Sequence, residues 1–128
     1  MLQVAVAVIE RDGRILIGQR PAHKSHPLEW EFPGGKVEAG ESPCEALLRE
    51  LREELKIEAQ IGCEIMRSRH RHGGKDPLEL IFFEVVGFQG DPVNQVFADL
   101  RWIKRSEFAS YRFLEGDRAF IRSLTAGL

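Results

Sequence analysis

The chain has 128 residues, of which 43% are hydrophobic and 30% charged, and its formal net charge is −2. This length predicts one domain over residues 1–128 that can bury a core, and the composition excludes disordered and fibrous classes of protein. Because the net charge gives no bulk attraction to nucleic acid or to an anionic membrane, function must depend on a local site.

Two cysteines, Cys44 and Cys63, are too few for a disulfide framework or a zinc ligand set, which favours a reducing, cytoplasmic setting. The N-terminus lacks a basic segment followed by a long apolar one, and no run approaches the roughly 18 apolar residues of a membrane span. We therefore expect a soluble, unprocessed protein.

The first elements predicted are two antiparallel strands, over residues 2–9 and 14–17. They flank Asp12-Gly13, a pair that strongly favours a tight hairpin. Residues 21–29 have no hydrophobic period and predict a loop, which leads into a short apolar element at 30–32.

Pro33-Gly34-Gly35 should interrupt regular structure before a helix begins after Ser42. A capping serine, a proline at the first helical position and Glu45 three residues after the serine are typical signals of a helix start. The helix should end near Lys56. Its expected core-facing stripe is Cys44, Leu47, Leu48, Leu51 and Leu55.

The second half of the chain predicts strands, loops and short helical segments. In chain order these are a strand over 57–66, a basic hairpin loop over 67–77, a strand over 78–88, a short strand over 100–103, a helical turn over 106–111 and a C-terminal helix over 114–124. Strands outnumber helices and most are joined by hairpins, so the fold class is α+β, with helices on the faces of a mixed sheet.

Three carboxylates share one face of the predicted helix, since Glu50, Glu53 and Glu54 are related as i, i+3 and i+4. Like charges at this spacing destabilise a helix by roughly 0.2–0.5 kcal/mol per pair, and a bound divalent cation such as Mg²⁺ would reverse that sign. In isolation, such a cluster is more typical of a solvated charged face. The upstream Gly34-Gly35-Lys36 favours a site, because a backbone without side chains can approach the helix and Lys36 adds a cation.

Taken together, these residues resemble the Nudix box: Gly35, five residues, Glu41, seven residues, then Arg49 to Glu54 (RELREE) and apolar Ile57. The segment from Trp30 to Glu38 (WEFPGGKVE) resembles the MutT-like branch of that family. The resemblance implies a Nudix-type α/β/α sandwich, in which a catalytic helix and a C-terminal helix lie on the faces of a mixed sheet.

The resemblance also implies roles for the box residues, with Mg²⁺ as cofactor and Mn²⁺ able to substitute. The implied metal ligands are the Gly35 carbonyl and the carboxylates of Glu50, Glu53 and Glu54. Arg49 would orient the glutamates, Glu41 would hold Arg49, and Lys36 would stabilise the departing phosphate. Glu53 is favoured as the general base that activates the attacking water.

Substrate contacts are implied for three further residues, each of which could instead be purely structural. Arg20 matches a position that contacts nucleotide phosphates, and Phe32 and Asp117 match positions that hold the base. An ionised Asp117 only accepts hydrogen bonds, which would favour a base that offers amino or protonated ring nitrogen groups. His70 and His72 could contact phosphate or RNA, or have no specific role.

Two positions depart from the family pattern. Lys56 replaces a glycine at the helix exit, so altered local geometry is expected there, with activity retained. The position where many relatives have a loop glutamate is Val96, so either Asp99 substitutes or the enzyme uses one metal ligand fewer.

The predicted function is Mg²⁺-dependent hydrolysis of a nucleoside triphosphate to a monophosphate and pyrophosphate. The enzyme would clean the nucleotide pool of an oxidised or otherwise modified substrate such as 8-oxo-dGTP. One alternative is an RNA 5′ pyrophosphohydrolase guided by the basic segment from Arg67 to Lys75, and another is a Nudix domain that senses a nucleotide without hydrolysing it. No membrane partner is expected, and the choice between monomer and homodimer is left open.

Overall fold

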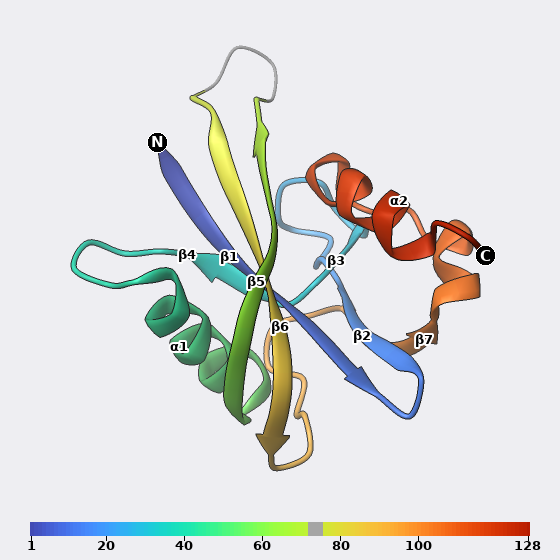
Figure 1. Ribbon diagram of the computed structural model, residues 1–128, viewed down its shortest axis with the longest axis horizontal. Helices are drawn as coiled ribbons and strands as arrows, with labels where there is room; N and C mark the ends of the chain where they lie inside the picture. Colours follow the sequence, from blue (N-terminus) through green and yellow to red (C-terminus); the bar gives the residue numbers. More distant parts are fainter. Residues whose placement is uncertain (72–75) are drawn as a thin grey trace.

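The computed structural model describes residues 1–71 and 76–128, so the predicted roles of His72 and Lys75 lie outside the described residues. A seven-stranded mixed sheet forms the centre of the fold (Figure 1). Its strands are β1 (Leu2–Arg11), β2 (Arg14–Gln19), β3 (Trp30–Glu31), β4 (Gly34–Lys36), β5 (Glu58–His70), β6 (Leu78–Gln89) and β7 (Asp99–Lys104). The helices are α1 (Pro43–Leu55) and α2 (Arg118–Thr125), with 3-10 helices η1 (Arg105–Ser110) and η2 (Glu115–Asp117) before α2.

The sheet combines hairpins with one long parallel pairing. Its main path runs β3-β2-β1-β6-β5, while β4 pairs with β1 and β7 with β2. Strands β1 and β6 are parallel along residues 2–9 and 78–85, and β5 runs antiparallel to β6. The β1–β2 turn uses Asp12 and Gly13 at φ 54° and 76°, the positive angles of a primed hairpin turn. The mixed sheet and the first hairpin are therefore as predicted.

Two strand predictions were wrong. Residues 34–36 do not interrupt the structure but form β4, because a glycine backbone lies flat against β1, with Gly34 opposite Val6 and Gly35 opposite Ala5. The basic loop predicted from residue 67 begins later, since pairing with β6 extends β5 to His70. The hydrogen bonds of β4 come from a strand distant in the sequence, whereas those that extend β5 come from its hairpin partner β6.

Helix α1 begins as its sequence predicts. The Ser42 side chain accepts a hydrogen bond from the Glu45 amide, and the Glu45 carboxylate accepts one from the Ser42 amide. The buried residues of the helix are Ala46, Leu47, Leu51 and Leu55. Cys44 is exposed, so its place in the predicted stripe was wrong, and Ala46 completes the buried face instead.

Two apolar clusters lie on opposite sides of the central strands. Successive residues of β1 point to opposite faces, so Ala5, Ala7 and Ile9 pack with α1, whereas Val6 and Val8 pack with the aromatic residues beneath η1 and α2. Figure 1 shows α1 and α2 on opposite sides of these strands. The layered arrangement predicted for the fold is confirmed.

The C-terminal segment is helical only from Arg118, because residues 115–117 form the 3-10 helix η2 rather than the first turn of α2. The predicted start at residue 114 was therefore early. No helix within the described ranges is long and apolar enough to cross a membrane.

Candidate active site

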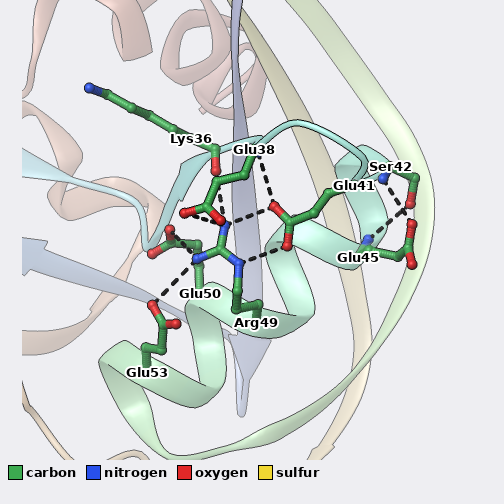
Figure 2. A network of polar contacts seen from close by, with 8 residues as sticks. All are labelled: Lys36, Glu38, Glu41, Ser42, Glu45, Arg49, Glu50 and Glu53. Carbon is green, nitrogen blue, oxygen red and sulfur yellow. Dashed lines mark hydrogen bonds and ion pairs between the residues drawn. The ribbon is translucent and has the colours of Figure 1, made fainter.

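Arg49 lies at the centre of a polar network on the exposed side of α1 (Figure 2). Its guanidinium donates to both carboxylate oxygens of Glu41, at 2.7 and 2.9 Å, and to Glu50 at 3.0 Å. It also donates to Glu53 at 3.4 Å and to the Lys36 carbonyl at 3.1 Å. Arg49 thus connects Glu41, strand β4 and two of the three predicted metal ligands, Glu50 and Glu53.

Glu41 is the strongest partner of Arg49. The two hydrogen bonds from the guanidinium, together with one from the Glu38 amide, lower the pKa of Glu41 to about 2. The carboxylate therefore remains ionised at neutral pH and fixes the orientation of Arg49. The predicted tie between Glu41 and Arg49 is present.

Glu50 lies directly against Gly35 of β4. A Cβ atom added at Gly35 would collide with the Glu50 carboxyl group, so only glycine allows the strand and this side chain to approach so closely. Loss of hydration raises the pKa of Glu50, although the bonds from Arg49 oppose the shift. The arrangement places a half-buried carboxylate beside a glycine backbone.

Glu54 is held from the same strand, because the Gly34 amide donates to its Oε1 at 3.1 Å. Burial raises the pKa of Glu54 to about 8, against this hydrogen bond, and the charges of Glu50 and Glu31 raise it further. Glu53, in contrast, is 59% exposed and is held only at its far end by Arg49. The two desolvated carboxyl groups of Glu50 and Glu54 and the exposed carboxylate of Glu53 thus share one helix face.

The donor set fits a hard divalent cation by its chemistry, since carboxylate oxygens lie beside a glycine backbone that leaves room for them. The side chains of Glu50, Glu53 and Glu54 do not surround a common point. Within residues 1–71 and 76–128, no three histidine, cysteine, aspartate or glutamate side chains are gathered in a metal-binding arrangement. Binding would require Glu54 to turn from the Gly34 amide.

The C-terminal end of α1 is capped by the loop that contains Val96, a contact that the sequence did not predict. The amides of Val93 and Gln95 donate to the carbonyls of Leu55 and Glu54, at 2.8 and 3.1 Å. Asn94 shapes this loop, because its Oδ1 accepts from the Val96 and Phe97 amides. The loop therefore fixes the part of α1 that carries the acidic side chains.

Comparison with known proteins agrees with this arrangement. The family model described as the NUDIX domain matches residues 1–124. The chain belongs to the Nudix hydrolase family. Members of this family generally use divalent metal ions, and the predicted enzyme class, a hydrolase of phosphoric anhydride bonds, is confirmed at the level of the Nudix family.

Named Nudix relatives cover nearly the whole chain. It is 40% identical over 126 residues to the CTP pyrophosphohydrolase of Escherichia coli (strain K12), a match that spans 98% of this chain and 93% of the relative. It is 30% identical over 125 residues to the 8-oxo-dGTP diphosphatase of Haemophilus influenzae, spanning 97% and 91%. The solution structure of the E. coli ORF135 protein aligns with a TM-score of 0.87 at 38% identity, covering 98% of this chain and 89% of that one.

Arg20, the predicted phosphate contact, follows β2 and lies beside β3 of the Nudix fold. Its guanidinium donates to Glu31 at 3.2 Å and to the Ser25 carbonyl and hydroxyl at 2.7 and 3.0 Å. Burial raises the pKa of Glu31, whereas Arg20 lowers it. These contacts use Nε and one N–H on each of the two terminal nitrogens, so further donors of the guanidinium remain for a phosphate.

The two predicted base contacts are both buried. Phe32 is 3% exposed and packs among Phe82, Phe108, Phe113 and Phe120, so the geometry does not support its contact with a base. Asp117 is 4% exposed, and burial raises its pKa well above the ordinary range, with a further upward contribution from the charge of Glu31. A hydrogen bond from the Phe32 backbone opposes this shift and lowers the pKa of Asp117.

The side chains of Lys36 and Asp99 do not join the network around Arg49 and the three glutamates. The Lys36 side chain extends away from the Arg49 network, and only its carbonyl takes part (Figure 2). Asp99 binds Arg101 at 2.8 Å and the Leu100 amide at 2.9 Å. Neither contact brings Asp99 to the three glutamates.

Lys56 does not alter the geometry at the end of α1, although the sequence predicted that it would. It adopts the left-handed conformation, φ 55° and ψ 38°, and its amide donates to the Arg52 carbonyl. The lysine thus takes the conformation that suits a glycine, and the expectation of altered geometry was wrong.

Sequence reasoning missed Glu31, which lies between two parts of the site. Its charge raises the pKa of both Glu54 on α1 and Asp117 on η2. The only signal available was an acidic residue in an apolar stretch, Trp30 to Phe32.

Proposed function

We propose that this Nudix hydrolase converts a nucleoside triphosphate to a nucleoside monophosphate and pyrophosphate. The observation that carries the proposal is the pair of desolvated carboxyl groups, Glu50 and Glu54, held by Arg49 and by the Gly34-Gly35 backbone. Packing carboxyl groups together without a cation is unfavourable, so the cluster is best explained by a positively charged ligand.

Mg²⁺ is the proposed ion, with Mn²⁺ able to substitute. Glu50, Glu53 and Glu54 would hold it together with the Gly35 carbonyl, and when bound it supplies positive charge to the diphosphate oxygens. Arg49 does not need to meet the substrate. Because Glu41 and the Lys36 carbonyl hold its guanidinium, it keeps Glu50 and Glu53 in place.

Glu53 is the proposed general base. It is the most exposed of the three acids, at 59%, and only one hydrogen bond of 3.4 Å restrains it. An exposed carboxylate can accept the proton of a water that attacks phosphorus, whereas Oε1 of Glu54 already accepts from the Gly34 amide. The attacking oxygen joins phosphorus as the bond to pyrophosphate breaks.

The proposed substrate has a base that presents one donor and one acceptor on the same edge. Asp117 is buried, so a base can reach it only if the surrounding side chains move; burial favours its protonated form, which would then present the complementary acceptor and donor. The edge of cytosine formed by N3 and its amino group has this pattern, as does the O6 and N7–H edge of 8-oxoguanine. CTP and 8-oxo-dGTP are therefore the first substrates to compare.

The test is pyrophosphate release by the purified protein with Mg²⁺, measured for CTP, dCTP, 8-oxo-dGTP and unmodified purine nucleotides. Glu53→Gln should lower kcat by at least about a hundredfold, because the amide cannot accept the proton. Glu58→Gln is the matched control: Glu58 is 60% exposed and also pairs with an arginine, Arg52, but it lies in β5. This control should keep wild-type turnover.

The same assay decides between an enzyme and a nucleotide sensor. If wild-type protein binds these nucleotides and releases neither phosphate nor pyrophosphate from them, the chain is a sensor and the proposed reaction is wrong. Equal loss in the Glu53 and Glu58 variants would also contradict the role given to Glu53.

A further inference from the structure

We propose that the arginine face of α2 binds the phosphate backbone of a single-stranded nucleic acid, away from the site on α1. This arginine face is defined by Arg112, Arg118 and Arg122, which are all exposed. Helix α2 lies across the sheet from α1, so a strand bound there leaves the glutamate face open (Figure 1).

Among the residues that the structure describes, these three arginines, like Arg14, have no carboxylate partner, whereas most of the other arginines do. Elsewhere, Arg20, Arg49, Arg52, Arg101 and Arg105 all pair with an aspartate or glutamate. In the part of the chain that the structure describes, the arginine face forms no ion pair, and its one hydrogen bond runs from Arg118 to the Phe113 carbonyl at 3.4 Å. Positive charge is thus left available in a protein whose net charge is −2.

The spacing on α2 makes this concentration of charge unfavourable without a ligand. Arg118 and Arg122 are four residues apart, so they lie one above the other on the same side of the helix, where like charges repel. Guanidinium groups bind phosphate through paired hydrogen bonds, which would turn the repulsion into attraction. An anion that meets both side chains is the simplest ligand for this face.

Two hollows flank α2, and Arg118 and Arg122 line both of them. The first, of about 370 Å³, lies toward η1 and has Tyr111, Phe113 and Ile121 in its walls, with Arg112 at its edge. The second, of about 310 Å³, lies toward the end of β5; its lining includes Ser68, Arg69 and one acidic residue, Glu115. The arginine face is therefore the ridge between two hollows.

This geometry favours a strand over a free nucleotide. A ligand that occupies both hollows must cross a helix about 10 Å wide, and consecutive nucleotides of a strand can place a base in one hollow and phosphates along the arginines. The aromatic and aliphatic walls of the first hollow suit an unpaired base, and the arginines at its rim suit the phosphates that follow. A base on an apolar surface and phosphates on arginines are the usual features of single-strand binding.

The test measures binding, so it does not depend on the proposed hydrolysis. Fluorescence anisotropy would follow a labelled single-stranded oligonucleotide with a 5′-hydroxyl end, in RNA and DNA versions, across a salt series. Binding of either version supports the proposal, and the version that binds more tightly shows whether the ligand is RNA or DNA. The R112E/R122E variant should bind at least about tenfold more weakly, and the slope of log affinity against log salt should fall by about 1.4 for two lost phosphate contacts.

The matched control is R14E/K104E. Arg14 and Lys104 are exposed partners in the β2–β7 register and line neither hollow, and the change in net charge is the same. This variant should bind within about twofold of wild type, since its charges are not at the proposed surface. Pyrophosphate release from a mononucleotide should be unchanged in R112E/R122E, which shows that the fold is intact. If that variant does not fold, R112Q/R122Q replaces it.

Three results would overturn the proposal. Wild-type protein could fail to bind either oligonucleotide at low salt, or the two charge-reversal variants could lose equal affinity. Alternatively, polyglutamate of equal charge could displace the oligonucleotide as well as unlabelled strand does, which would make the arginine face a site for an acidic protein segment.

Discussion

The two adjacent glycines of β4 show how much the site depends on single atoms. Gly34 has φ +150°, and a Cβ there would meet the backbone carbonyl of Ala5, whereas a Cβ on Gly35 would meet the carboxyl end of Glu50. The first obstacle is rigid backbone and the second is a movable side chain. Gly34 is therefore required by the fold, and Gly35 by the position of Glu50.

Alanine at these positions should separate stability from activity. Gly35→Ala should change the free energy of unfolding by less than about 1 kcal/mol, because Glu50 can move, but lower kcat by about a hundredfold, since a misplacement near 1 Å has that effect. Gly34→Ala should lower the free energy of unfolding by about 1–3 kcal/mol. Urea denaturation and pyrophosphate release measure the two quantities. Wild-type kcat in Gly35→Ala would show that the position of Glu50 is unimportant.

At this scale the sequence predicted the local contacts and missed the distant ones. The pairing of Arg49 with Glu53 and Glu41 follows from helix spacing and from the box pattern, and both contacts are present. The relation of Glu31 to Glu54 and Asp117 joins β3, α1 and η2. No spacing in the sequence brings these three segments together, so only the fold could reveal it.

Among the elements, α1 shows the same division between local and distant causes. Its start was predictable because Ser42, Pro43 and Glu45 form a cap from neighbouring residues. Strand β4 and the extension of β5 were not, since their hydrogen bonds come from β1 and β6. The loop that caps the end of α1 is also supplied from far along the chain, through Val93 and Gln95.

The left-handed residue that ends α1 gives a test of this element. At φ 55°, Lys56 has a Cβ in a region that favours glycine by about 1 kcal/mol. Lys56→Gly should therefore be more stable than Lys56→Ala by about that amount, because both variants lose the same charge and only the alanine keeps the Cβ. Chemical denaturation of the two variants measures the difference. Equal stabilities would mean that the cap is not strained.

On the scale of the whole molecule, β1 and β6 couple the two faces of the sheet. Ala5 and Ile81 pack toward α1, whereas Val6 and Phe82 pack toward η1 and α2. If the packing on one face of a strand is lost, the packing on the other face is disturbed as well, since the side chains alternate along a single backbone. The site on α1 and the arginine face of α2 should therefore depend on one cooperative fold.

Phe120 tests this coupling. It is 5% exposed on α2, stacks on Phe82 with ring centroids 4.6 Å apart, and meets Phe32 at 5.6 Å. Phe120→Ala should lower the free energy of unfolding by about 3–5 kcal/mol, because it leaves a cavity in the aromatic cluster. This loss of stability should affect the unfolding of both faces of the sheet.

The two tryptophans allow each face to be followed separately. Trp30 belongs to the cluster beneath η1 and α2, whereas Trp102 packs against the cluster beneath α1. In single-tryptophan proteins made with Trp102→Phe or Trp30→Phe, the urea midpoints should coincide, and Phe120→Ala should shift both equally. If the Trp102 signal kept its midpoint while the Trp30 signal moved, the α1 face would fold independently of α2.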